Sequence, residues 1–390
     1  MRLPTRVAAY VDLRYTTRKP TGVDKHIRRM VRGLSADESF NVSALAPRSQ
    51  LVASGSIPPS SSLAGLPADP LPFTNRQARM LWAVSPWPPI DRYCPDADWI
   101  YSPQDLWAPA RHARTAVTIH GATYFEPAYP GYHSAWARFE RARMSWFFKQ
   151  VCRHADLVIS VSKYLETFLI DRFGLHERRS LVVGNGVDEC FYTVGRSENL
   201  VHDPDRILVV GGLNDWDGAA HVLAAADLLR SQLPTVTIDI AGTFDSDHYV
   251  AAADARPNIR RLGYVESEKL ASLMPGYLAL LYLPNVESFG MVALEAMAAG
   301  LPVIASRSTA VPETAGDAAI YVDLPPGTGS FCEAKGACPL LSAIEMLRDS
   351  GSARAEWIAR GKARAAAFTW DRCVHRLAAA LHPDREHNHG

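Results

Sequence analysis

The stretch of sequence that decides the fold runs from residue 283 to residue 306 and reads LPNVESFGMVALEAMAAGLPVIAS. An apolar run ends at Leu283, a polar loop follows, and strong helix formers begin near Gly290. Gly300 and Pro302 then stand where a helix is expected to stop, ahead of a second apolar run. These residues predict a strand, a loop, a helix and a strand in succession, which is the repeating unit of a parallel sheet covered by helices.

The same alternation of short β-branched runs and helical patterns extends along the rest of the chain. A chain of 390 residues is long enough for two domains. We therefore expect the α/β class, with two doubly wound, Rossmann-like sheets of about six strands each. Strands are expected at 7–13, 42–46, 99–101, 116–119, 157–161 and 181–183, and then at 207–210, 236–240, 259–262, 278–283, 303–305 and 319–322.

A polar, turn-rich stretch near the middle of the chain predicts a linker between the two domains. Apolar residues at helical spacing between Trp370 and Leu381 predict a docked C-terminal helix. Residues 49–72 are rich in Ser, Pro, Gly and Ala and are expected to form a surface loop. The expected domain limits are 1–193 for the N-terminal domain, 194–204 for the linker, 205–368 for the C-terminal domain, and 369–390 for the last helix and tail.

Composition argues against several classes of function and partner. Lys plus Arg number 41 and Asp plus Glu also number 41, so no overall field favours nucleic acid. The chain shows no secretory signal, no apolar run of spanning length, and no cysteine or histidine spacing typical of zinc. We expect a cytoplasmic protein without a metal site. The aromatic residues around Trp146 stand among basic residues, which fits either a peripheral membrane surface or an amphipathic core helix.

Polar groups in the stretch 283–306 are suited to an extended anionic ligand. Ligands of open α/β sheets bind beyond the carboxyl ends of the strands, where helix N-termini offer backbone amides. The amides near Phe289, Gly290 and Met291 can hold a phosphate there. Glu287 in the loop and Glu295 in the helix can accept from two different sets of hydroxyls. Alternatively, Glu295 only supports the helix and Glu287 is a solvated acid.

This stretch resembles the donor-site signature of glycosyltransferase family 4, in which two glutamates bracket Phe-Gly-Leu and Met291 here replaces the Leu. The resemblance implies a GT-B fold, with two domains facing across a cleft and the last helix docked on the N-terminal domain. It also implies a retaining enzyme that uses a nucleotide-diphosphate sugar and needs no other cofactor. Glu287 would contact the transferred sugar, the amides from Ser288 to Met291 the distal phosphate, and Glu295 the ribose.

The resemblance extends over most of the chain. Gly22 lies in a Thr-Gly-Val segment similar to the family's first glycine-bearing loop, whose amides face the donor. Thr-Ile-His120 resembles the family's Thr-Ile-His-Asp, which implies that His120 acts at the reacting sugar, although Gly121 replaces the Asp. Tyr264 and Val265 resemble the loop beneath the nucleotide base. Two further stretches match the family, residues 156–162 and 183–188.

One departure concerns the cations that neutralise the donor diphosphate. Gly212 stands where the family has Arg, and Asp217 where it has Lys. Removing both should cost several kcal/mol of transition-state stabilisation. A divalent ion held by Asp215 or Asp217 is one alternative, and a pocket that binds without transferring is another. Candidate replacement cations are Arg260, Arg261, Lys269 and Arg307.

The acceptor is expected on the N-terminal domain, at an aromatic-rich segment. Aromatic faces suit sugar rings and suit ordinary packing equally. We expect a glycan or polyprenyl-linked acceptor, a donor such as GDP-mannose with UDP- and dTDP-sugars left open, and a role in bacterial surface polysaccharide synthesis. The rival hypothesis is a non-catalytic GT-B subunit that binds a sugar nucleotide or a partner. The acceptor candidates are Tyr124, Phe125, Tyr129 and Trp136.

Overall fold

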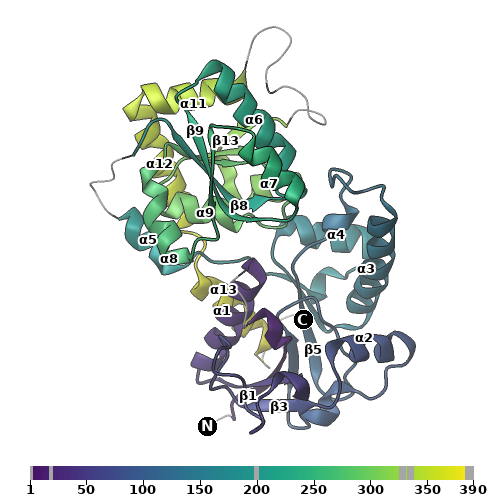
Figure 1. The fold of residues 1–390 in the computed structure, drawn as a ribbon. Helices are drawn as coiled ribbons and strands as arrows, with labels where there is room; N and C mark the ends of the chain where they lie inside the picture. The colour runs from purple at the N-terminus through teal and green to yellow at the C-terminus, as the bar shows by residue number, and fades with distance from the viewer. Residues whose placement is uncertain (1–2, 17–20, 197–201, 325–330, 332–337, 383–390) are drawn as a thin grey trace. The chain divides into compact units, whose positions relative to one another are not determined.

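The computed structural model describes residues 3–16, 21–196, 202–324, 331 and 338–382. The chain divides into two compact units, each built around one parallel sheet (Figure 1). The expected α/β class with two Rossmann-like sheets is confirmed. Unit 1 comprises Met1–Gly121, Ala142–Asn185 and Trp370–Gly390, and unit 2 comprises Ala122–Arg141 and Gly186–Thr369.

The sheet of unit 1 has seven strands in its described part, in the order β3-β2-β1-β4-β5-β6-β7. The strands are β1 (Thr5–Tyr10), β2 (Phe40–Pro47), β3 (Ala68–Leu71), β4 (Trp99–Ser102), β5 (Arg114–Ile119), β6 (Leu157–Ser160) and β7 (Ser180–Val182). Its helices are α1 (Gly22–Ala36), α2 (Asn75–Val84), α4 (Lys163–Phe173) and α13 (Trp370–Leu381), while α3 (Ala135–His154) begins in the segment that belongs to unit 2. Short 3-10 helices cover Leu13–Tyr15, Arg48–Gln50, Ile90–Tyr93 and Glu177–Arg179.

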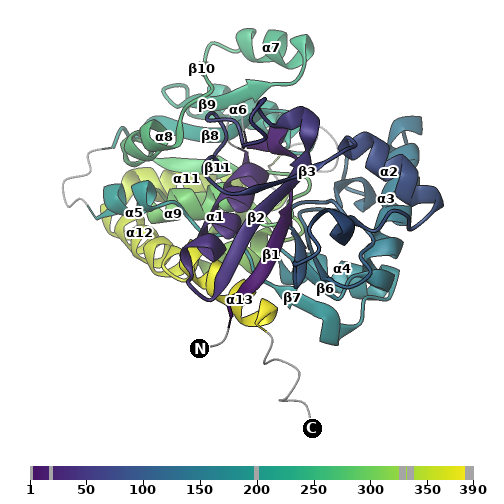
Figure 2. The same ribbon diagram turned by 90° about the horizontal axis from the view of Figure 1, so that it is seen from below.

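Strand β3 was not expected, because it lies inside the segment 49–72 that composition assigned to a loop. It pairs in parallel with β2, from Ala44 opposite Ala68 to Pro47 opposite Leu71, and Figure 2 shows β3, β2 and β1 in succession. Pro70 stands within this four-residue edge strand, where an amide donor is not required. A short edge strand that tolerates proline therefore has the composition of a loop.

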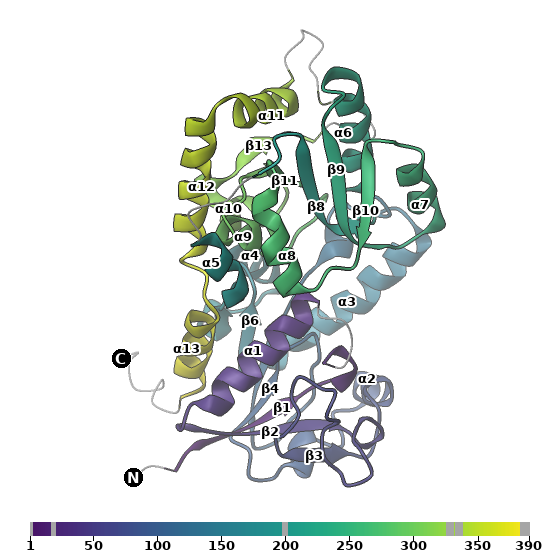
Figure 3. The same ribbon diagram turned by 60° about the vertical axis from the view of Figure 1, so that its left-hand side comes forward.

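Helix α13 packs against α1, as the sequence predicted for the last helix (Figure 3). Helix α1 begins after Thr21, whose hydroxyl accepts the amide of Asp24 at 3.2 Å. At the contact, a Cβ on Gly33 would lie 2.3 Å from Val374 Cγ2. The glycine therefore allows the two helices to approach closely.

The sheet of unit 2 has six described strands in the order β10-β9-β8-β11-β12-β13. The strands are β8 (Arg206–Leu213), β9 (Thr237–Phe244), β10 (Ile259–Gly263), β11 (Ala279–Tyr282), β12 (Val303–Ser306) and β13 (Ile320–Val322). The helices are α5 (Glu189–Gly195), α6 (Ala219–Gln232), α7 (Asp247–Asp254), α8 (Ser267–Leu273), α9 (Met291–Ala298), α10 (Val311–Ala315), α11 (Pro339–Asp349) and α12 (Gly351–Ala365). Short 3-10 helices cover Thr123–Phe125, Met274–Gly276 and Gly316–Ala318.

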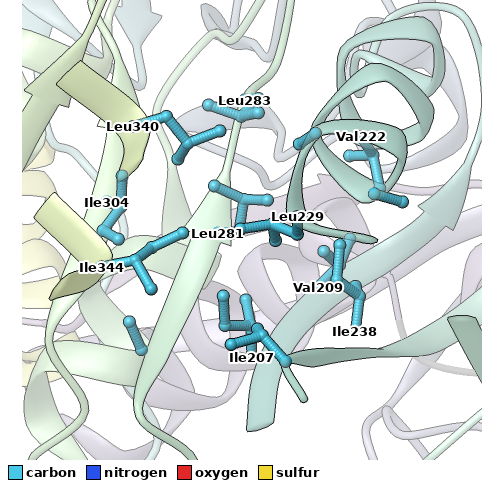
Figure 4. Close-up of a cluster of buried hydrophobic side chains, with 14 of the residues drawn as sticks. Ile207, Val209, Val222, Leu229, Ile238, Leu281, Leu283, Ile304, Leu340 and Ile344 are labelled. Carbon is cyan, nitrogen blue, oxygen red and sulfur yellow. The ribbon is translucent and has the colours of Figure 1, made fainter. Parts of the chain in front are cut away.

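A buried aliphatic cluster fixes this sheet between its helices (Figure 4). Leu281 of β11 lies at its centre, with Val209 of β8 and Leu229 of α6 nearby and Ile344 of α11 on the other side. Each fully buried side chain of this size contributes roughly 1.5–3 kcal/mol. Since the strands are held by this core, the loops beyond their carboxyl ends are available for binding.

The observed units differ from the domain limits expected from the sequence. The chain crosses between units after Asn185, ahead of the expected linker, and residues 197–201 of that linker lie outside the described part. Residues 122–141 group with unit 2, although they lie far from it in sequence. In the described part of the chain, no helix is both long and apolar enough to cross a membrane.

Candidate functional site

The stretch 283–306 folds as predicted, with β11, a loop, α9 and β12 in succession. Gly290 is the N-cap of α9 and has φ +97°, a conformation that glycine adopts without strain. At the other end the amide of Leu301 donates to Ala296 O at 2.9 Å, and Gly300 has φ +79°. Both glycines therefore set the ends of the helix, and the loop between β11 and α9 lies at the carboxyl edge of the sheet.

The carboxylate of Glu287 is held inside this loop. Its Oε1 accepts the amides of Ser288 at 2.8 Å and Phe289 at 3.0 Å, and its Oε2 accepts the hydroxyl of Tyr282. Two amides that we expected to meet a phosphate are therefore occupied by Glu287 itself. Within the described residues the amides of Gly290 and Met291 donate to no partner, so these two are open to an anion at the N-terminus of α9.

Several acids gather around Tyr282. Burial, and then the charges of Glu287, Asp217 and Glu295, raise the pKa of Tyr282 well above its ordinary value. Glu295 lies within α9 and is only 4% exposed. The structure thus brings both signature glutamates together at one edge of the sheet, with Asp217 beside them.

A second loop, after β12, holds the Glu287 loop in place through hydrogen bonds. The sequence analysis did not predict this contact. Thr309 Oγ1 accepts the amide of Glu287 at 2.7 Å and donates to its carbonyl at 2.5 Å. Ser306 and Ser308 both donate to Pro284 O. Thr309 has φ +39°, the one positive φ outside glycine in the described chain, and such strain often marks a functional site. The polar run that directly follows a buried strand was the available signal.

The last residues of β8 and the loop after it leave no room for a side chain at position 212. Gly212 has φ +89°, and a Cβ there would lie 1.7 Å from Thr243 O of β9. Gly218 has φ +77°, and a Cβ there would lie 1.9 Å from Leu283 O. Both positions are therefore closed to any side chain with this backbone.

Asp217 is fixed and half-buried in the loop after β8. Asn214 Nδ2 donates to its Oδ2 at 2.5 Å, and its own amide donates to Asn214 Oδ1 at 2.7 Å. Burial raises the pKa of Asp217 to about 6, opposed by the Asn214 hydrogen bond and assisted by the charges of Glu287 and Asp245. A fraction of this acid is therefore neutral near pH 6.

Asn285 ties the two loops together. Its side-chain amide donates to Asp215 O at 2.7 Å, its backbone amide donates to Trp216 O at 2.9 Å, and its Oδ1 accepts His221 Nε2 at 3.0 Å. Tyr249 donates to the carboxylate of Asp215. In the described residues no three acids, histidines or cysteines are placed to hold a metal ion, so the divalent-ion alternative gains no support.

The loop expected beneath the base follows β10 at the same edge. Gly263 has φ +69° and turns the chain after the strand. Tyr264 and Val265 are both half-buried, and the hydroxyl of Tyr264 donates to Glu266 at 3.3 Å. Because the strands are parallel, this loop shares an edge with the Glu287 loop, as expected.

His120 directly follows β5 in unit 1. Its amide donates to Asp105 Oδ1 at 3.1 Å and its Nε2 donates to Pro103 O at 2.9 Å. The ring of His26, on α1, lies edge-on at 4.8 Å. His26 Nδ1 bonds Asn185 Oδ1 at 2.8 Å, and burial lowers the pKa of His26 to about 3, so that ring stays neutral. Sequence reasoning missed His26.

Gly22 stands at the first position of α1 and is exposed. The preceding residues 17–20 lie outside the described part of the chain. The role of its amide at the donor therefore stays a prediction.

Family models match both halves of the chain. The model described as Glycosyltransferase Family 4 matches residues 20–190, and the one described as Glycosyl transferases group 1 matches residues 194–364. The chain belongs to glycosyltransferase family 4.

Similar proteins agree with this assignment. The glycosyltransferase is 26% identical to the O-antigen chain mannosyltransferase B of Escherichia coli over 71% of this chain and 72% of that protein. It is 25% identical to the phosphatidyl-myo-inositol mannosyltransferase of Mycolicibacterium smegmatis over 91% of this chain and 88% of that protein. The crystal structure of Anabaena Alr3699/HepE in complex with UDP has a TM-score of 0.66 at 17% identity, covering 97% and 99% of the two chains. The last comparison shows a shared fold.

Of the four candidate cations in this glycosyltransferase, the structure brings Arg307 to the edge that holds Glu287. Arg307 follows β12 and directly precedes the Ser308–Thr309 clamp. Its guanidinium lies 4.3 Å from the centre of the Tyr321 ring, and it makes no salt bridge among the described residues.

The other three candidates lie elsewhere. Arg260 donates to the carboxylate of Asp239 at 2.9 Å and 2.5 Å. Asp239 lies in the amino half of β9, away from the carboxyl end of that strand. Arg261 bonds Asp254 at 2.7 Å and 3.1 Å. Lys269 is exposed on α8. Two of the three are thus engaged in ion pairs and are poor replacements for the missing pair.

The aromatic segment of the glycosyltransferase belongs to unit 2, not to the N-terminal domain as expected. Tyr129 packs with Val286, the residue before Glu287, and Tyr124 lies edge-on to Tyr129 at 5.4 Å. Phe125 is buried, whereas Trp136 is 60% exposed. Tyr124 and Tyr129 therefore lie against the Glu287 loop, because apolar side chains from segments that are distant in sequence pack together there.

Proposed function

We propose that this glycosyltransferase is a retaining enzyme that moves a hexose from a nucleotide-diphosphate sugar to a glycan or polyprenyl-linked acceptor. Support comes from relatives whose names state mannosyl transfer to an O-antigen chain and to phosphatidyl-myo-inositol, and from a structural relative that binds UDP. GDP-mannose is our preferred donor, ahead of UDP- and dTDP-sugars. The reaction would serve surface polysaccharide synthesis at the cytoplasmic side of the membrane.

One observation carries the proposal. The Glu287 carboxylate is preorganised by Tyr282 and two loop amides, directly beside the open amides of Gly290 and Met291. A carboxylate that needs no rearrangement is suited to a sugar hydroxyl, and a helix N-terminus is suited to a phosphate. The two groups are the two ends of a sugar phosphate.

The remaining donor contacts follow from the same edge of the sheet. We assign the ribose to Glu295, the base to the Tyr264–Val265 loop, and the leaving diphosphate to the N-terminus of α9 with Arg307. The chemistry proposed is departure of the diphosphate from an oxocarbenium-like sugar, with a phosphate oxygen taking the proton of the acceptor hydroxyl. No metal or further cofactor enters this scheme. His120 would position the sugar through its ring, whose orientation Pro103 and His26 fix.

A second candidate function rests on the loop after β8. Because Gly212 and Asp217 supply no cation, the leaving diphosphate is less stabilised than in the family pattern. A non-catalytic subunit that binds a sugar nucleotide would need no such stabilisation.

The two functions separate in one assay. The protein is incubated with GDP-mannose and with UDP- and dTDP-hexoses, with and without a polyprenyl-linked acceptor, and nucleoside diphosphate release is measured. We expect acceptor-dependent release from one donor. No release from any donor, with or without Mg²⁺, would reject transfer and leave the binding function, and release without any acceptor would indicate a hydrolase.

A further inference from the structure

His26 lies on the buried face of α1 and contacts the histidine that follows β5. It is 0% exposed, and it shares this face with four apolar side chains that are equally buried, those of Ile27, Met30, Val31 and Leu34. An aliphatic side chain would fill position 26 without the cost of burying an imidazole. The polar ring therefore indicates a role other than packing.

One hydrogen bond fixes the imidazole of His26. Its Nδ1 lies 2.8 Å from Oδ1 of Asn185, a residue that is itself buried. Since an amide oxygen can only accept, Nδ1 carries the proton and donates. Burial lowers the pKa of His26 to about 3, so the ring is neutral and Nε2 is its acceptor. That Nε2 is buried without a hydrogen-bond partner among the described residues, so Asn185 sets the plane of the ring.

The ring of His26 in turn lies against the ring of His120. The two ring centres are 4.8 Å apart and the ring planes meet at 89°, which is the edge-to-face arrangement that aromatic pairs prefer. His120 is also held by the hydrogen bonds of its Nε2 to Pro103 O and of its amide to Asp105. A single hydrogen bond at Nε2 leaves the plane of the His120 ring free to turn. The contact with His26 supplies the missing constraint.

His26 also contacts the places where the chain passes between the two units. The chain leaves unit 1 after Asn185 and returns to it at Trp370. Asn185 is the hydrogen-bond partner of His26, and the indole of Trp370 lies with its ring centre 6.2 Å from that of His26. His120 stands next to Gly121, after which the chain crosses a third time. One buried ring therefore joins three crossings of the chain.

Helix α1 meets α13 at two places, which hold His26 in position. Trp370, the first residue of α13, lies near His26. One turn later Val374 lies so close to Gly33 that an added Cβ would be 2.3 Å from its Cγ2. Because glycine permits this approach, the two helices are closely packed on either side of the histidine pair. His26 thus belongs to a packed helix and not to a loop.

We infer that His26 is a positioning residue for the transfer reaction, which ties the ring of His120 to the chain crossings at Asn185 and Trp370. The inference rests on the role proposed for His120 at the sugar. It extends that role to Asn185, which acts on His120 through His26. A substitution at Asn185 should then disturb His120 only while His26 can donate to it.

The test uses the full chain and two readouts, the ring ¹⁵N signals of histidine-labelled protein, and kcat with KM for the donor. The His120 signal is assigned by its absence in His120→Asn. His26→Phe keeps an aromatic ring on the same face of α1 and removes the hydrogen bond to Asn185. It should broaden the His120 signal and lower kcat about tenfold while KM for the donor changes less than about twofold, since a misplaced group costs turnover more than ground-state binding.

Asn185→Leu removes the same hydrogen bond from the other partner at similar volume, and should have the same effects. The double variant should be no worse than either single variant, because both changes break one bond. Circular dichroism checks folding, and if His26→Phe does not fold, Asn185→Leu decides with the same readouts. A wild-type His120 signal in these variants, or effects on kcat that multiply in the double variant, would overturn the inference.

Matched controls are His375→Phe, at an exposed histidine of α13, and Val31→Ala, on the buried face of α1. The first makes the same change in the same unit, and the second weakens the packing of α1 without removing the hydrogen bond to Asn185. An equal effect on the His120 signal in Val31→Ala would assign it to loosened helix packing and overturn the inference. The ring signals need no substrate, so absence of transfer from every donor would reject the proposed function and leave the test of His26 in place.

Discussion

The loops after β8 and β11 belong to neighbouring strands of one sheet, yet they keep the family pattern to very different degrees. The loop after β11 has Glu287 and Gly290, and the space around Gly290 is open, with the nearest side-chain atoms 3.8 Å from an added Cβ. The end of β8 and the loop after it have Gly212 and Asp217 where the family pattern has cations, and Gly212 and Gly218 sit against backbone at less than 2 Å from an added Cβ. An added Cβ would find open space at Gly290, whereas Gly212 and Gly218 are packed against backbone.

This difference shows that a missing functional residue can be a consequence of backbone geometry. An Arg at position 212 would require β8 and β9 to separate, since Gly212 lies opposite Thr243 in the ladder. Asp217 instead makes two hydrogen bonds with Asn214, one through its carboxylate and one through its backbone amide. Under the proposed function, the positive charge for the diphosphate comes from another loop, and Arg307 is the candidate at the edge of the sheet that holds Glu287.

The largest effect is expected at the packed glycine. Gly212→Ala should cost more than about 3 kcal/mol of unfolding free energy, because the methyl group meets Thr243 O and φ is positive. Denaturant titration measures it. Gly290→Ala is the matched change, with the same sign of φ and open space, and should cost only about 1–2 kcal/mol. An equal loss of unfolding free energy in the two variants would contradict the difference in packing between the two glycines.

Asp217 provides a test through pH. Its raised pKa means that the folded state favours the protonated form, so this contribution to stability is full below about pH 4 and is lost as pH rises through about 6. Asp217→Asn should therefore gain on the order of 2–3 kcal/mol over the wild type between pH 4 and pH 8. Thermal or denaturant unfolding across this range measures the gain. A constant difference between the two proteins would show that Asp217 ionises normally.

Arg307 provides a test of the replacement charge. Arg307→Ala should lower kcat/KM by about 10- to 100-fold, since a charge-assisted contact to the leaving diphosphate is worth roughly 1.5–3 kcal/mol. Arg261→Ala is the control, because Arg261 pairs with Asp254. If the two variants keep the same activity, the diphosphate is stabilised without Arg307.

The smallest effect is expected at the clamp. Thr309→Val removes the hydroxyl that bonds the amide and carbonyl of Glu287, and should lower stability by about 1 kcal/mol and kcat with it. Thr309→Ser keeps the hydroxyl and should retain kcat. A loss of kcat in the Ser variant as large as that in the Val variant would assign the effect to the strained backbone.

Much of the fold was predictable from the sequence, because periodic apolar runs and helix stop signals are local. The strand, loop and helix around Glu287 followed from Gly290, Gly300 and the apolar runs on either side. Strand β3 was not predictable, since Pro70 gives an edge strand the composition of a loop.

In the candidate site, only the residues that resemble the family's sequence signature were predictable. Glu287 and Glu295 were found in this way, and the structure brings them together around Tyr282. Thr309 and His26 were not, because their roles depend on loops and helices that meet only in the folded chain. The grouping of residues 122–141 with unit 2 has the same cause.

The most direct test of the donor assignment is to measure turnover and nucleotide binding together in Glu287→Ala, with Glu295→Ala beside it. If Glu287 contacts the transferred sugar, Glu287→Ala should abolish transfer while affinity for the nucleoside diphosphate stays near the wild-type value, and Glu295→Ala should weaken that affinity. Wild-type turnover in Glu287→Ala would contradict the assignment and with it the central role of the loop after β11.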